Sequence, residues 1–345
     1  MRFARLTAAA TIIVAGLLGT TRAAGVPPQP AVSCRDLSFP VTLGAGHPLY
    51  LMGGRLCVPE GATVLEVLVS GFTYSGDYWD FPYEPDRYSY VRAANAAGFA
   101  TLSINRPGTG PSALPPAQLP PATALTVDSE ADALHQMLTA LPTVTGGSRF
   151  ARIVLVGHSL GSNVSMVAAA RFPDDVDGVI LTGLLHYPLP LGAGDYVHPA
   201  TEDPKFAGYP AGYVTTKTGV RGPLFYDTDY ADPRVIAEDE QRKSTGTTSE
   251  QATSAGGIGS AGIRVPVLLV VGRNDGSYCA RRLSCADAEA VLAHERPYYP
   301  AAPELAAFVL PRAGHSINLH PNASDWFDAA IQWTADHLGD RSTTR

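Results

Sequence analysis

Short apolar runs alternate along the chain with longer segments in which apolar residues recur every three or four positions. The runs predict buried strands, and the longer segments predict helices with one buried face. The predicted strands are Tyr50–Val58, Val64–Ser70, Ala100–Ile104, Ile153–Val156, Val179–Leu181, Val267–Val271 and Ala306–Leu310. The predicted helices are Asp86–Ala97, Asp128–Leu141, Leu160–Arg171 and Ser324–Leu338, with Asp86 and Ser324 as N-caps. This alternation predicts an α/β fold with a mostly parallel sheet and helices on both faces.

The stretch from Leu184 to Ile263 breaks this alternation because it contains no long apolar strand. Its first half is rich in glycine, proline and aromatic residues, and its second half, from Asp232 to Gly262, is polar. A structureless loop of such length is unusual inside a domain. We therefore expect a cap or lid at about 184–263, helical in part over Asp232–Lys243, inserted into a single domain that spans residues 25–345.

The first residues have the anatomy of an export signal. Arg2 and Arg5 give a positive start, Leu6–Leu18 is apolar apart from two threonines, and small residues follow up to Ala24. About 20 apolar residues are needed to span a bilayer, and this run is shorter. The segment therefore predicts a signal peptide over residues 1–24 and a secreted, extracellular protein without a stable membrane anchor.

Composition narrows the class of partner. The 345-residue chain is 45% hydrophobic and 17% charged, which is typical of a globular protein. Its formal net charge of −7 gives no electrostatic basis for binding nucleic acid, so we expect no nucleic-acid partner.

Four cysteines make disulfides the leading expectation for an exported chain. An even number of cysteines in an oxidising compartment indicates disulfides, and four allow three pairings. We expect the local pairing, Cys34–Cys57 and Cys279–Cys285. Because neither a C-x-x-C nor an H-E-x-x-H motif occurs, the sequence predicts no metal site, and nothing in it implies an organic cofactor.

The clearest chemical motif is Gly157-His158-Ser159-Leu160-Gly161. It follows a predicted strand and opens a predicted helix, the context in which a G-x-S-x-G motif places a nucleophilic serine on a tight turn. The glycines leave room where strand and helix approach, and the helix N-terminus supplies backbone N–H groups and a positive dipole end. A purely structural turn is the alternative, and the strand–turn–helix context favours Ser159 as the nucleophile.

A serine hydroxyl needs a base, and that base needs an acid to orient it. In folds with this motif the chain order is serine, acid, histidine. His315 follows the last predicted strand through a short turn, so it is the expected base, with His320 as the alternative. Asp275 follows the strand Val267–Val271 and is the expected acid, although an aspartate before Gly276 is also a turn signal.

A tetrahedral intermediate needs two backbone donors for its oxyanion. The N–H of Leu160, directly after the nucleophile, is the first. The second is expected in the loop after the early parallel strand, where Gly71 allows close approach, and we choose Phe72 with Thr73 as the alternative. The side chain of Tyr74 is a possible substrate-binding group or, equally, a packing aromatic.

These motifs resemble the α/β-hydrolase superfamily, and more closely its secreted, capped serine hydrolases of the esterase and lipase type. The resemblance covers about Val64–Leu338 and is carried by the Gly71-Phe72 turn, the loop Asn105–Ser112 and the Ser159 motif. It implies the α/β-hydrolase fold with a mostly parallel eight-stranded sheet. It disfavours the family members that have an aspartate nucleophile, because serine occupies that position here.

Two positions depart from the family's usual pattern. The loop resembles the family's Asp-Arg-x-Gly-x-Gly-x-Ser pattern with Asn105 in place of the aspartate, and Ser70 stands where the early turn usually has histidine. Neither departure affects the three residues expected to form the triad.

The expected function is hydrolysis of a carboxylic ester or lactone through an acyl-enzyme. The aromatic-rich cap favours a moderately large apolar substrate within the class of small-molecule esters and lactones, and the alternative is that its aromatic residues only hold the cap against the core. A peptidase or amidase of the same fold is the alternative, since acidic residues of the cap could hold a free amine: Glu202, Asp203, Glu238, Asp239 and Glu240. A perhydrolase would use the same triad, and a non-catalytic hydrolase-like binding protein is a further hypothesis from a different class.

Overall fold

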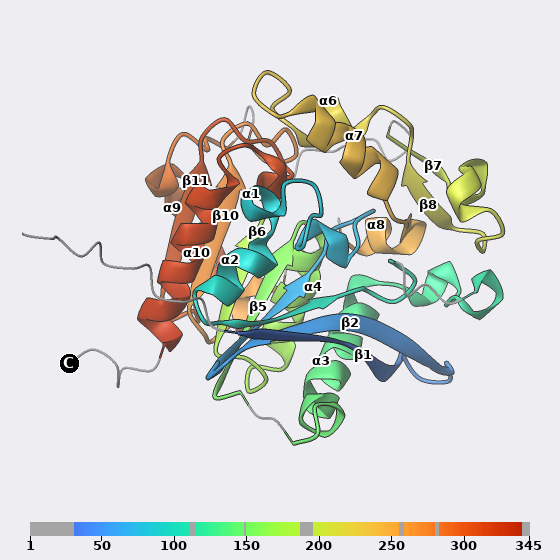
Figure 1. Ribbon diagram of the computed structural model, residues 1–345, viewed down its shortest axis with the longest axis horizontal. Helices are drawn as coiled ribbons and strands as arrows, with labels where there is room; N and C mark the ends of the chain where they lie inside the picture. Colours follow the sequence, from blue (N-terminus) through green and yellow to red (C-terminus); the bar gives the residue numbers. More distant parts are fainter. Residues whose placement is uncertain are drawn as a thin grey trace, which may run out of the picture.

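The computed structural model describes residues 31–110, 115–147, 150–186, 196–254, 259–279 and 283–339. The predicted signal peptide, residues 1–24, lies outside the described residues. An eight-stranded sheet runs through the centre of the molecule in the order β1-β2-β4-β3-β5-β6-β10-β11 (Figure 1). Its strands are β1 (Val32–Thr42), β2 (Leu49–Pro59), β3 (Val64–Val69), β4 (Ala100–Ile104), β5 (Arg152–His158), β6 (Gly178–Thr182), β10 (Val267–Gly272) and β11 (Leu305–Leu310). All neighbours from β4 to β11 are parallel, and β1 and β2 form an antiparallel edge.

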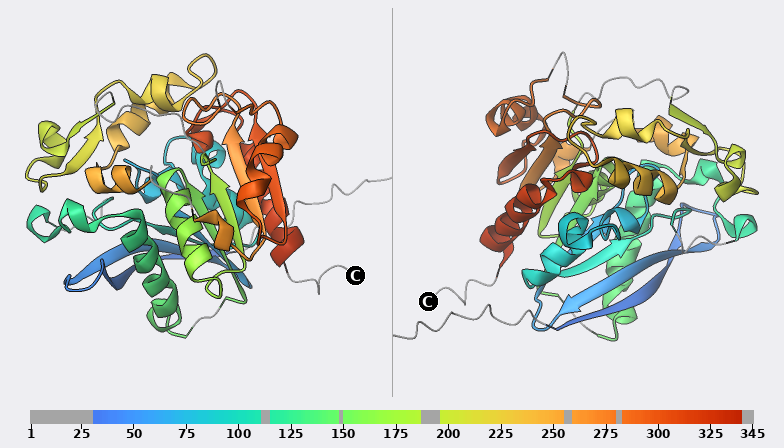
Figure 2. Two further views of the ribbon diagram at one scale, coloured as in Figure 1. Left: turned by 180° about the vertical axis from the view of Figure 1, so that it is seen from behind. Right: turned by 45° about the horizontal axis from the view of Figure 1, so that its top comes forward.

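The parallel strands are apolar on both faces because helices cover both. Along β3, Leu65 and Val67 pack into one hydrophobic cluster while Val64 and Leu68 pack into the other, as successive side chains of a strand point to opposite faces. One cluster includes α3 (Val127–Val144), α4 (Leu160–Arg171) and α9 (Ala288–Glu295). The other includes α1 (Pro85–Tyr88), α2 (Tyr90–Ala96) and α10 (Ala323–Leu338). The result is a three-layer α/β/α arrangement, visible from two sides in Figure 2.

The segment between β6 and β10 forms a separate small layer, which we call the cap segment. Its described residues form a three-stranded antiparallel sheet and α-helices: β7 (Val197–Pro199), β8 (Tyr213–Thr216), β9 (Gly246–Thr247), α6 (Arg221–Phe225), α7 (Pro233–Arg242) and α8 (Thr248–Ser254). The expected helix over Asp232–Lys243 is α7, and the Asp232 side chain caps it by accepting from the Arg234 amide. Backbone bonds join the cap segment to the loops after β3 and β11, from the Ser244 amide to the Thr73 oxygen and from the Ser316 amide to the Phe225 oxygen. Residues 187–195 and 255–258 of the predicted cap lie outside the described residues.

Two predicted helices differ from those in the structure, the first by a break and the second at its start. The single helix expected over Asp86–Ala97 is two short helices, because Ser89 adopts an extended conformation and its side chain caps α2 by accepting from the Arg92 amide. The C-terminal helix begins at Ala323 with Asn322 before it, so the predicted N-cap Ser324 lies inside the first turn.

The long edge strand β1 was not predicted. Its side chains are mostly exposed, with only Phe39 and Val41 of its large apolar residues fully buried, so it lacks a continuous apolar run. It pairs along its whole length with β2, and Cys34 lies directly opposite Cys57.

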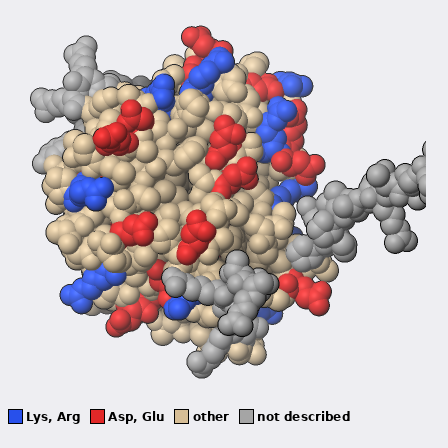
Figure 3. All heavy atoms as spheres, turned by 90° about the vertical axis from the view of Figure 1, so that its left-hand side faces the viewer, with Lys and Arg blue, Asp and Glu red and all other residues tan. Residues whose placement is uncertain are grey.

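Both expected cysteine pairs lie at disulfide bonding distance, with S–S separations of 2.04 Å for Cys34–Cys57 and 2.03 Å for Cys279–Cys285. No helix in the described part of the chain is long and apolar enough to cross a membrane. Acidic and basic side chains are interspersed over the face shown in Figure 3 and do not gather into a patch of one sign.

Candidate active site

Ser159 occupies a strained turn between β5 and α4. Its backbone has φ 53° and ψ −116°, a conformation that side-chain-bearing residues seldom adopt and that clusters at functional sites. The flanking glycines make the turn possible, since a Cβ at Gly161 would overlap the backbone oxygens of Val69 and Ser70, and one at Gly157 would overlap the Ser162 backbone. Ser159 is half-buried between buried neighbours, so the turn presents its hydroxyl at the end of the sheet.

Asp275 and His315 meet at the carboxyl ends of two neighbouring strands. Asp275 follows β10, His315 follows β11, and the His315 Nδ1 lies 2.8 Å from the Asp275 Oδ2. The other carboxylate oxygen, Oδ1, accepts a 2.8 Å hydrogen bond from the Ser277 amide. Asp275 is fully buried and His315 is 5% exposed, so the carboxylate fixes the imidazole with its Nδ1 as the donor. The predicted acid and predicted base are therefore hydrogen-bonded partners.

His158 and Gly183 show how close the Ser159 turn lies to His315. The ring centroids of His158 and His315 are 5.0 Å apart, and a Cβ at Gly183 would lie within 3.3 Å of atoms of both imidazoles. Gly183 has φ +59°, so both its backbone conformation and the space around it favour glycine. Burial, reinforced by the nearby His315 and Arg221, holds the pKa of His158 well below its usual range, so this imidazole stays neutral. Its ring stacks on Tyr78, with the centroids 4.3 Å apart.

The loop after β3 lies against the Ser159 turn. A Cβ at Gly71 would be 3.1 Å from the Ser159 Cβ, so glycine permits the close approach that the sequence predicted. Leu160 is the first residue of α4, and its N–H therefore has no acceptor within the helix. Within the described residues no backbone acceptor faces the Phe72 N–H either. Thr73, the alternative donor, has a positive φ of 59°, a backbone conformation that residues other than glycine seldom adopt.

Tyr74 is buried beneath the cap segment. Its hydroxyl donates to the Asp239 Oδ2 at 3.2 Å and also hydrogen-bonds the Ser316 Oγ, next to His315. Arg221 places its guanidinium 4.2 Å from the centroid of the Tyr74 ring and forms a two-pronged ion pair with Asp239, with both contacts at 2.9 Å. The Tyr74 hydroxyl is therefore hydrogen-bonded to protein groups on both sides. Through these bonds, Tyr74 links the cap segment to Ser316, the residue after His315.

His320, the alternative base, has both ring nitrogens committed to backbone. Its Nε2 accepts from the amides of Gly314 and Asp227 at 3.0 and 3.1 Å, and its Nδ1 donates to the Ser316 oxygen at 3.0 Å. Burial lowers the pKa of His320 from 6.5 to about 4, which keeps Nε2 an acceptor. The imidazole thus braces the backbone on both sides of His315.

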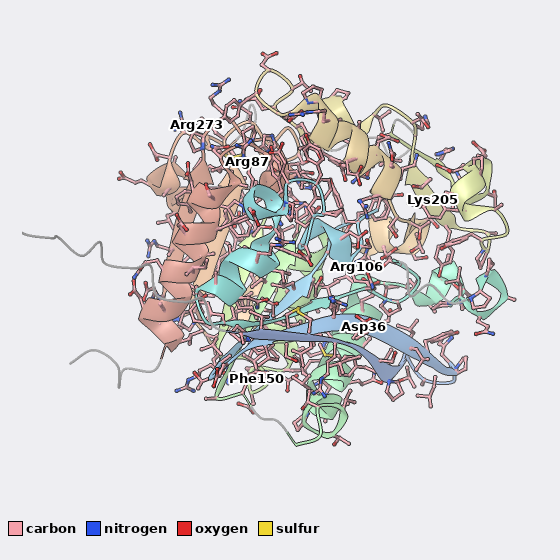
Figure 4. All side chains as sticks on the ribbon, in the orientation of Figure 1. Asp36, Arg87, Arg106, Phe150, Lys205 and Arg273 are labelled. Carbon is pink, nitrogen blue, oxygen red and sulfur yellow. A yellow bond between two sulfur atoms is a disulfide. The ribbon has the colours of Figure 1, made fainter. Side chains whose placement is uncertain are left out.

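Arg106 is a buried cation that sequence reasoning did not single out. It lies in the loop after β4, close to α8 in the view of Figure 4, and its side chain is 1% exposed. Its Nη1 contacts the Glu130 oxygens at 3.0 and 3.1 Å and forms a very short contact with Glu250 of α8. Burial and the negative charge of Glu250 raise the pKa of Glu130 well above its usual range although Arg106 opposes this.

The signal that would have found this cluster is weak in the sequence. Arg106 stands within the quoted Asn105–Ser112 loop, but its partners are 24 and 144 residues away. No group of three or more metal-ligating side chains occurs among the residues that the structure describes.

A cleft of about 390 Å³ opens between the cap segment and the loop after β3. Its lining includes the polar or charged side chains of Ser75, Asp77, Lys205, Glu238 and Arg242. Arg242 pairs with both Asp77 and Glu238 at 3.0 and 2.6 Å, so these charges compensate one another across the cleft.

Comparison with protein families identifies the architecture. The model of the alpha/beta hydrolase family matches residues 67–324, which is most of the chain. The chain belongs to the alpha/beta hydrolase family. That assignment agrees with the sheet order and with the strand–turn–helix context of Ser159. Comparison with curated protein sequences finds no significant match.

Solved structures of alpha/beta hydrolases share the fold at low sequence identity. A thermophilic esterase from Thermogutta terrifontis is 18% identical with a TM-score of 0.59, over 88% of this chain and 100% of that one. Naproxen esterase (carboxylesterase NP) from Bacillus subtilis is 17% identical with a TM-score of 0.58, over 88% and 92%. A monoacylglycerol lipase from Paleococcus ferrophilus is 16% identical with a TM-score of 0.55, over 88% and 99%. At such identities the likeness shows the fold alone.

Proposed function

We propose that this alpha/beta hydrolase is a secreted serine hydrolase that cleaves a carboxylic ester or lactone through an acyl-enzyme. The observation that carries the proposal is the hydrogen bond between buried Asp275 and His315 beside the strained Ser159 turn. A nucleophile, a base and an orienting acid supplied by three separate loops at one end of a sheet form the arrangement needed for acyl transfer.

In the first half-reaction, the Ser159 Oγ attacks the carbonyl carbon of the ester while the His315 Nε2 takes the hydroxyl proton. Asp275 holds the Nδ1 proton and stabilises the imidazolium that forms, without being protonated itself. The imidazolium then gives its proton to the leaving alcohol, which leaves an ester between substrate acyl group and serine. Water attacks this acyl-enzyme with His315 again as the base, and the carboxylic acid and free serine are released.

The negative charge on the tetrahedral oxygen falls between two backbone donors in this proposal. The Leu160 N–H lies at the start of α4, where unpaired amides and the helix dipole favour an anion. The Phe72 N–H supplies the second bond from the loop beside Ser159. Because the Tyr74 hydroxyl already has Asp239 and Ser316 as partners, we assign this residue to support of the site.

Aromatic side chains around His315 support an apolar substrate. The rings of Phe225 and Tyr278 lie 5.6 and 6.2 Å from the imidazole, centroid to centroid. Ligand sites are walled mainly by such groups and contain few polar ones. A small apolar ester or lactone fits this surrounding, and its cleavage requires no metal or organic cofactor.

A peptidase that holds a free amine receives less support. Such an enzyme needs an unpaired carboxylate near the nucleophile, and four of the five acidic residues considered for that role have cationic partners of their own. Asp239 pairs with Arg221, Glu238 with Arg242, and both Asp203 and Glu240 with Lys243. Glu202 lies 3.3 Å from the His198 ring. None of these carboxylates is left to bind an amine without first losing its partner.

Secretion and domain organisation are parts of the same proposal. Two disulfides are typical of chains that fold in an oxidising compartment. We infer that residues 1–24 are removed as a signal peptide and that residues 25–345 form one hydrolase domain in which the insertion at about 184–263 is a cap. The contacts of Phe225 and Ser244 with loops of the site support that role for the cap.

The first test is hydrolysis of p-nitrophenyl esters of increasing acyl length by the chain from residue 25 and by its Ser159→Ala variant. Turnover by the parent and its loss in the variant are expected, and the preferred acyl length measures the pocket. Labelling by a fluorophosphonate, blocked in Ser159→Ala, separates an enzyme from a binding protein. A folded parent that neither turns over esters nor reacts with the fluorophosphonate would refute the proposal. Labelling without ester turnover would favour an amidase or a narrow lactonase.

A further inference from the structure

The guanidinium of Arg106 joins the loop beside Ser159 to two other parts of the molecule. Its Nε donates to the Ser70 carbonyl oxygen at 3.0 Å, and its Nη2 donates to the Gly71 carbonyl oxygen at 3.1 Å. Its remaining nitrogen, Nη1, binds Glu130 of α3 and Glu250 of α8. A planar fork of five N–H donors suits this task because it contacts two carbonyls and two carboxylates at once.

The two bonds from Arg106, together with the turn bond from the Tyr74 amide to the Gly71 oxygen at 3.1 Å, fix the direction of an amide. The described chain has no cis peptide bond, so the unit that joins Gly71 and Phe72 is trans and planar. In such a unit the C=O and the N–H point in opposite directions. Because the Gly71 oxygen points at Arg106, the Phe72 N–H points away from it, on the loop that packs against Ser159.

The cap segment supplies one of the two carboxyl groups that hold Arg106. Thr247 and Glu250 form a capping box at the start of α8, in which the Glu250 amide donates to the Thr247 hydroxyl and the Glu250 carboxylate accepts from the Thr247 amide. The same carboxylate contacts Arg106. Docking of α8 and the orientation of the guanidinium are therefore linked through one buried side chain, which is 1% exposed.

We propose that Arg106, held by Glu130 and Glu250, is the positioning residue of the oxyanion hole: it fixes the Ser70 and Gly71 carbonyls so that the Phe72 N–H faces the tetrahedral oxygen. This inference rests on the proposed function and deepens it, because it assigns the geometry of the second donor to a buried cation shared with the cap segment. Arg106 acts through the backbone and does not touch the substrate.

Arg106→Lys tests the proposal, because a single ammonium cannot span the two carbonyls and both carboxylates. Loss of one oxyanion donor reduces kcat by about 100-fold or more, so we expect a fall of roughly that size with KM within about threefold. The affinity for an alkyl trifluoromethyl ketone, whose serine adduct carries an oxyanion, is expected to fall by a similar factor. Arg171→Gln is the matched control, since Arg171 bridges Asp128 and Asp132 on the same helix as Glu130 but touches no active-site loop.

Amide hydrogen exchange in the 69–74 loop gives a readout independent of activity, and it should be faster in Arg106→Lys but not in Arg171→Gln. If Arg106→Lys does not fold, Glu250→Gln decides, because glutamine preserves a capping box while it removes the anion. We then expect a lower kcat at unchanged KM. A folded Arg106→Lys, or in its absence Glu250→Gln, with parental kcat, inhibitor affinity and loop exchange would overturn the proposal. Absence of both Ser159-dependent turnover and fluorophosphonate labelling in the parent would refute the proposed function instead, and loop exchange would still test Arg106.

Discussion

Asp275 uses its two carboxylate oxygens for different partners, Oδ2 for His315 and Oδ1 for the Ser277 amide. In Asp275→Asn, the amide oxygen would keep the Ser277 bond and the NH₂ group would face His315, which forces the opposite imidazole tautomer. We expect kcat to fall by roughly 10³- to 10⁴-fold with little change in KM. Steady-state kinetics on the preferred p-nitrophenyl ester, together with a urea unfolding curve, would measure both. A loss below tenfold would argue against Asp275 as the orienting acid.

His320 braces the His315 loop only while it is neutral, because its Nε2 accepts from the Gly314 and Asp227 amides. Its pKa is lowered from 6.5 to about 4, so the folded state binds this proton less readily than the unfolded chain does. The stability it contributes is present above pH 6.5 and is lost as the pH falls toward 4. The loss amounts to about 3 kcal/mol.

Denaturant unfolding between pH 4 and pH 8 would test this for His320→Gln, in which the amide oxygen remains an acceptor. We expect the variant to lack the His320 contribution, so that its free energy of unfolding rises relative to that of the parent as the pH falls from 6.5 to 4. Parallel pH profiles of parent and variant would contradict the assigned role.

Glu66 has the opposite dependence on pH. It lies on β3, fully buried, with one oxygen accepting from the Thr334 hydroxyl, and burial raises its pKa from 4.5 to about 7. The folded state therefore favours the protonated form, and stability is lost as the pH rises from 4.5 to 7. We expect Glu66→Gln to raise the free energy of unfolding by about 2 to 3 kcal/mol at pH 8 and to leave it nearly unchanged at pH 4. Urea unfolding at the two pH values is the measurement, and equal effects at both would contradict it.

Among the elements, the cap helices α6 and α7 are fixed to the site by one buried ion pair. Asp239 of α7 accepts from Arg221 of α6 and also from the hydroxyls of Tyr74 and Tyr226. Removal of the charge in Asp239→Asn leaves Arg221 buried without its counter-ion, which costs about 3 to 5 kcal/mol. We expect that loss in urea unfolding, with a lower kcat because Tyr74 also contacts Ser316 beside His315.

The neighbouring residue provides the control for this prediction. Glu238 lies on the same helix but pairs with the partly exposed Arg242, and such pairs contribute less than about 1 kcal/mol. Glu238→Gln should therefore unfold within that margin of the parent and keep its kcat. Similar losses in the two variants would show that α7 tolerates no change of charge, which would remove the special role of Asp239.

Elements with a continuous apolar run were predicted well, and those held by side-chain bonds were not. Strand β4 and helix α4 have the predicted bounds because every residue of β4 and nine of the twelve residues of α4 are buried. The break at Ser89 depends on hydrogen bonds of one side chain, which caps α2 and donates to Asp80, and a helical pattern does not reveal them. Likewise, the chain order of serine, acid and histidine was sufficient to predict that Asp275 contacts His315. The contact between Arg106 and Glu250 could not be predicted in this way, because only the folded structure brings these two residues together.

At the scale of the whole molecule, the two buried titrations act against each other. Between pH 4.5 and 6.5 the unfolded chain binds a proton at His320 that the folded state lacks, and the folded state keeps one at Glu66 that the unfolded chain loses. Since the slope of stability with pH depends on the difference in bound protons, the two contributions nearly cancel in that interval. The stability of His320→Gln should therefore show the pH dependence that Glu66 produces, and the stability of Glu66→Gln should show the pH dependence that His320 produces.

The two disulfides stabilise different parts of the molecule, and their removal should have different effects. Cys34–Cys57 closes a loop with a sequence separation of 23, across β1 and β2 at the far edge of the sheet from β10 and β11. Its loss releases about 3 kcal/mol of loop-closure entropy to the unfolded chain, so Cys34→Ala/Cys57→Ala should be less stable by that amount while kcat is unchanged.

Cys279–Cys285 has a separation of only 6 and begins four residues after Asp275, whose backbone oxygen accepts from the Cys279 amide at 2.8 Å. Its loop-closure term is smaller, about 2 kcal/mol, but its Cys279 end is hydrogen-bonded to the backbone of the acid. Cys279→Ala/Cys285→Ala should therefore lose less stability and more kcat than the other double variant. Urea unfolding and ester kinetics on the two variants measure this contrast, and the reverse order in kcat would show that the bridge near Asp275 does not organise the site.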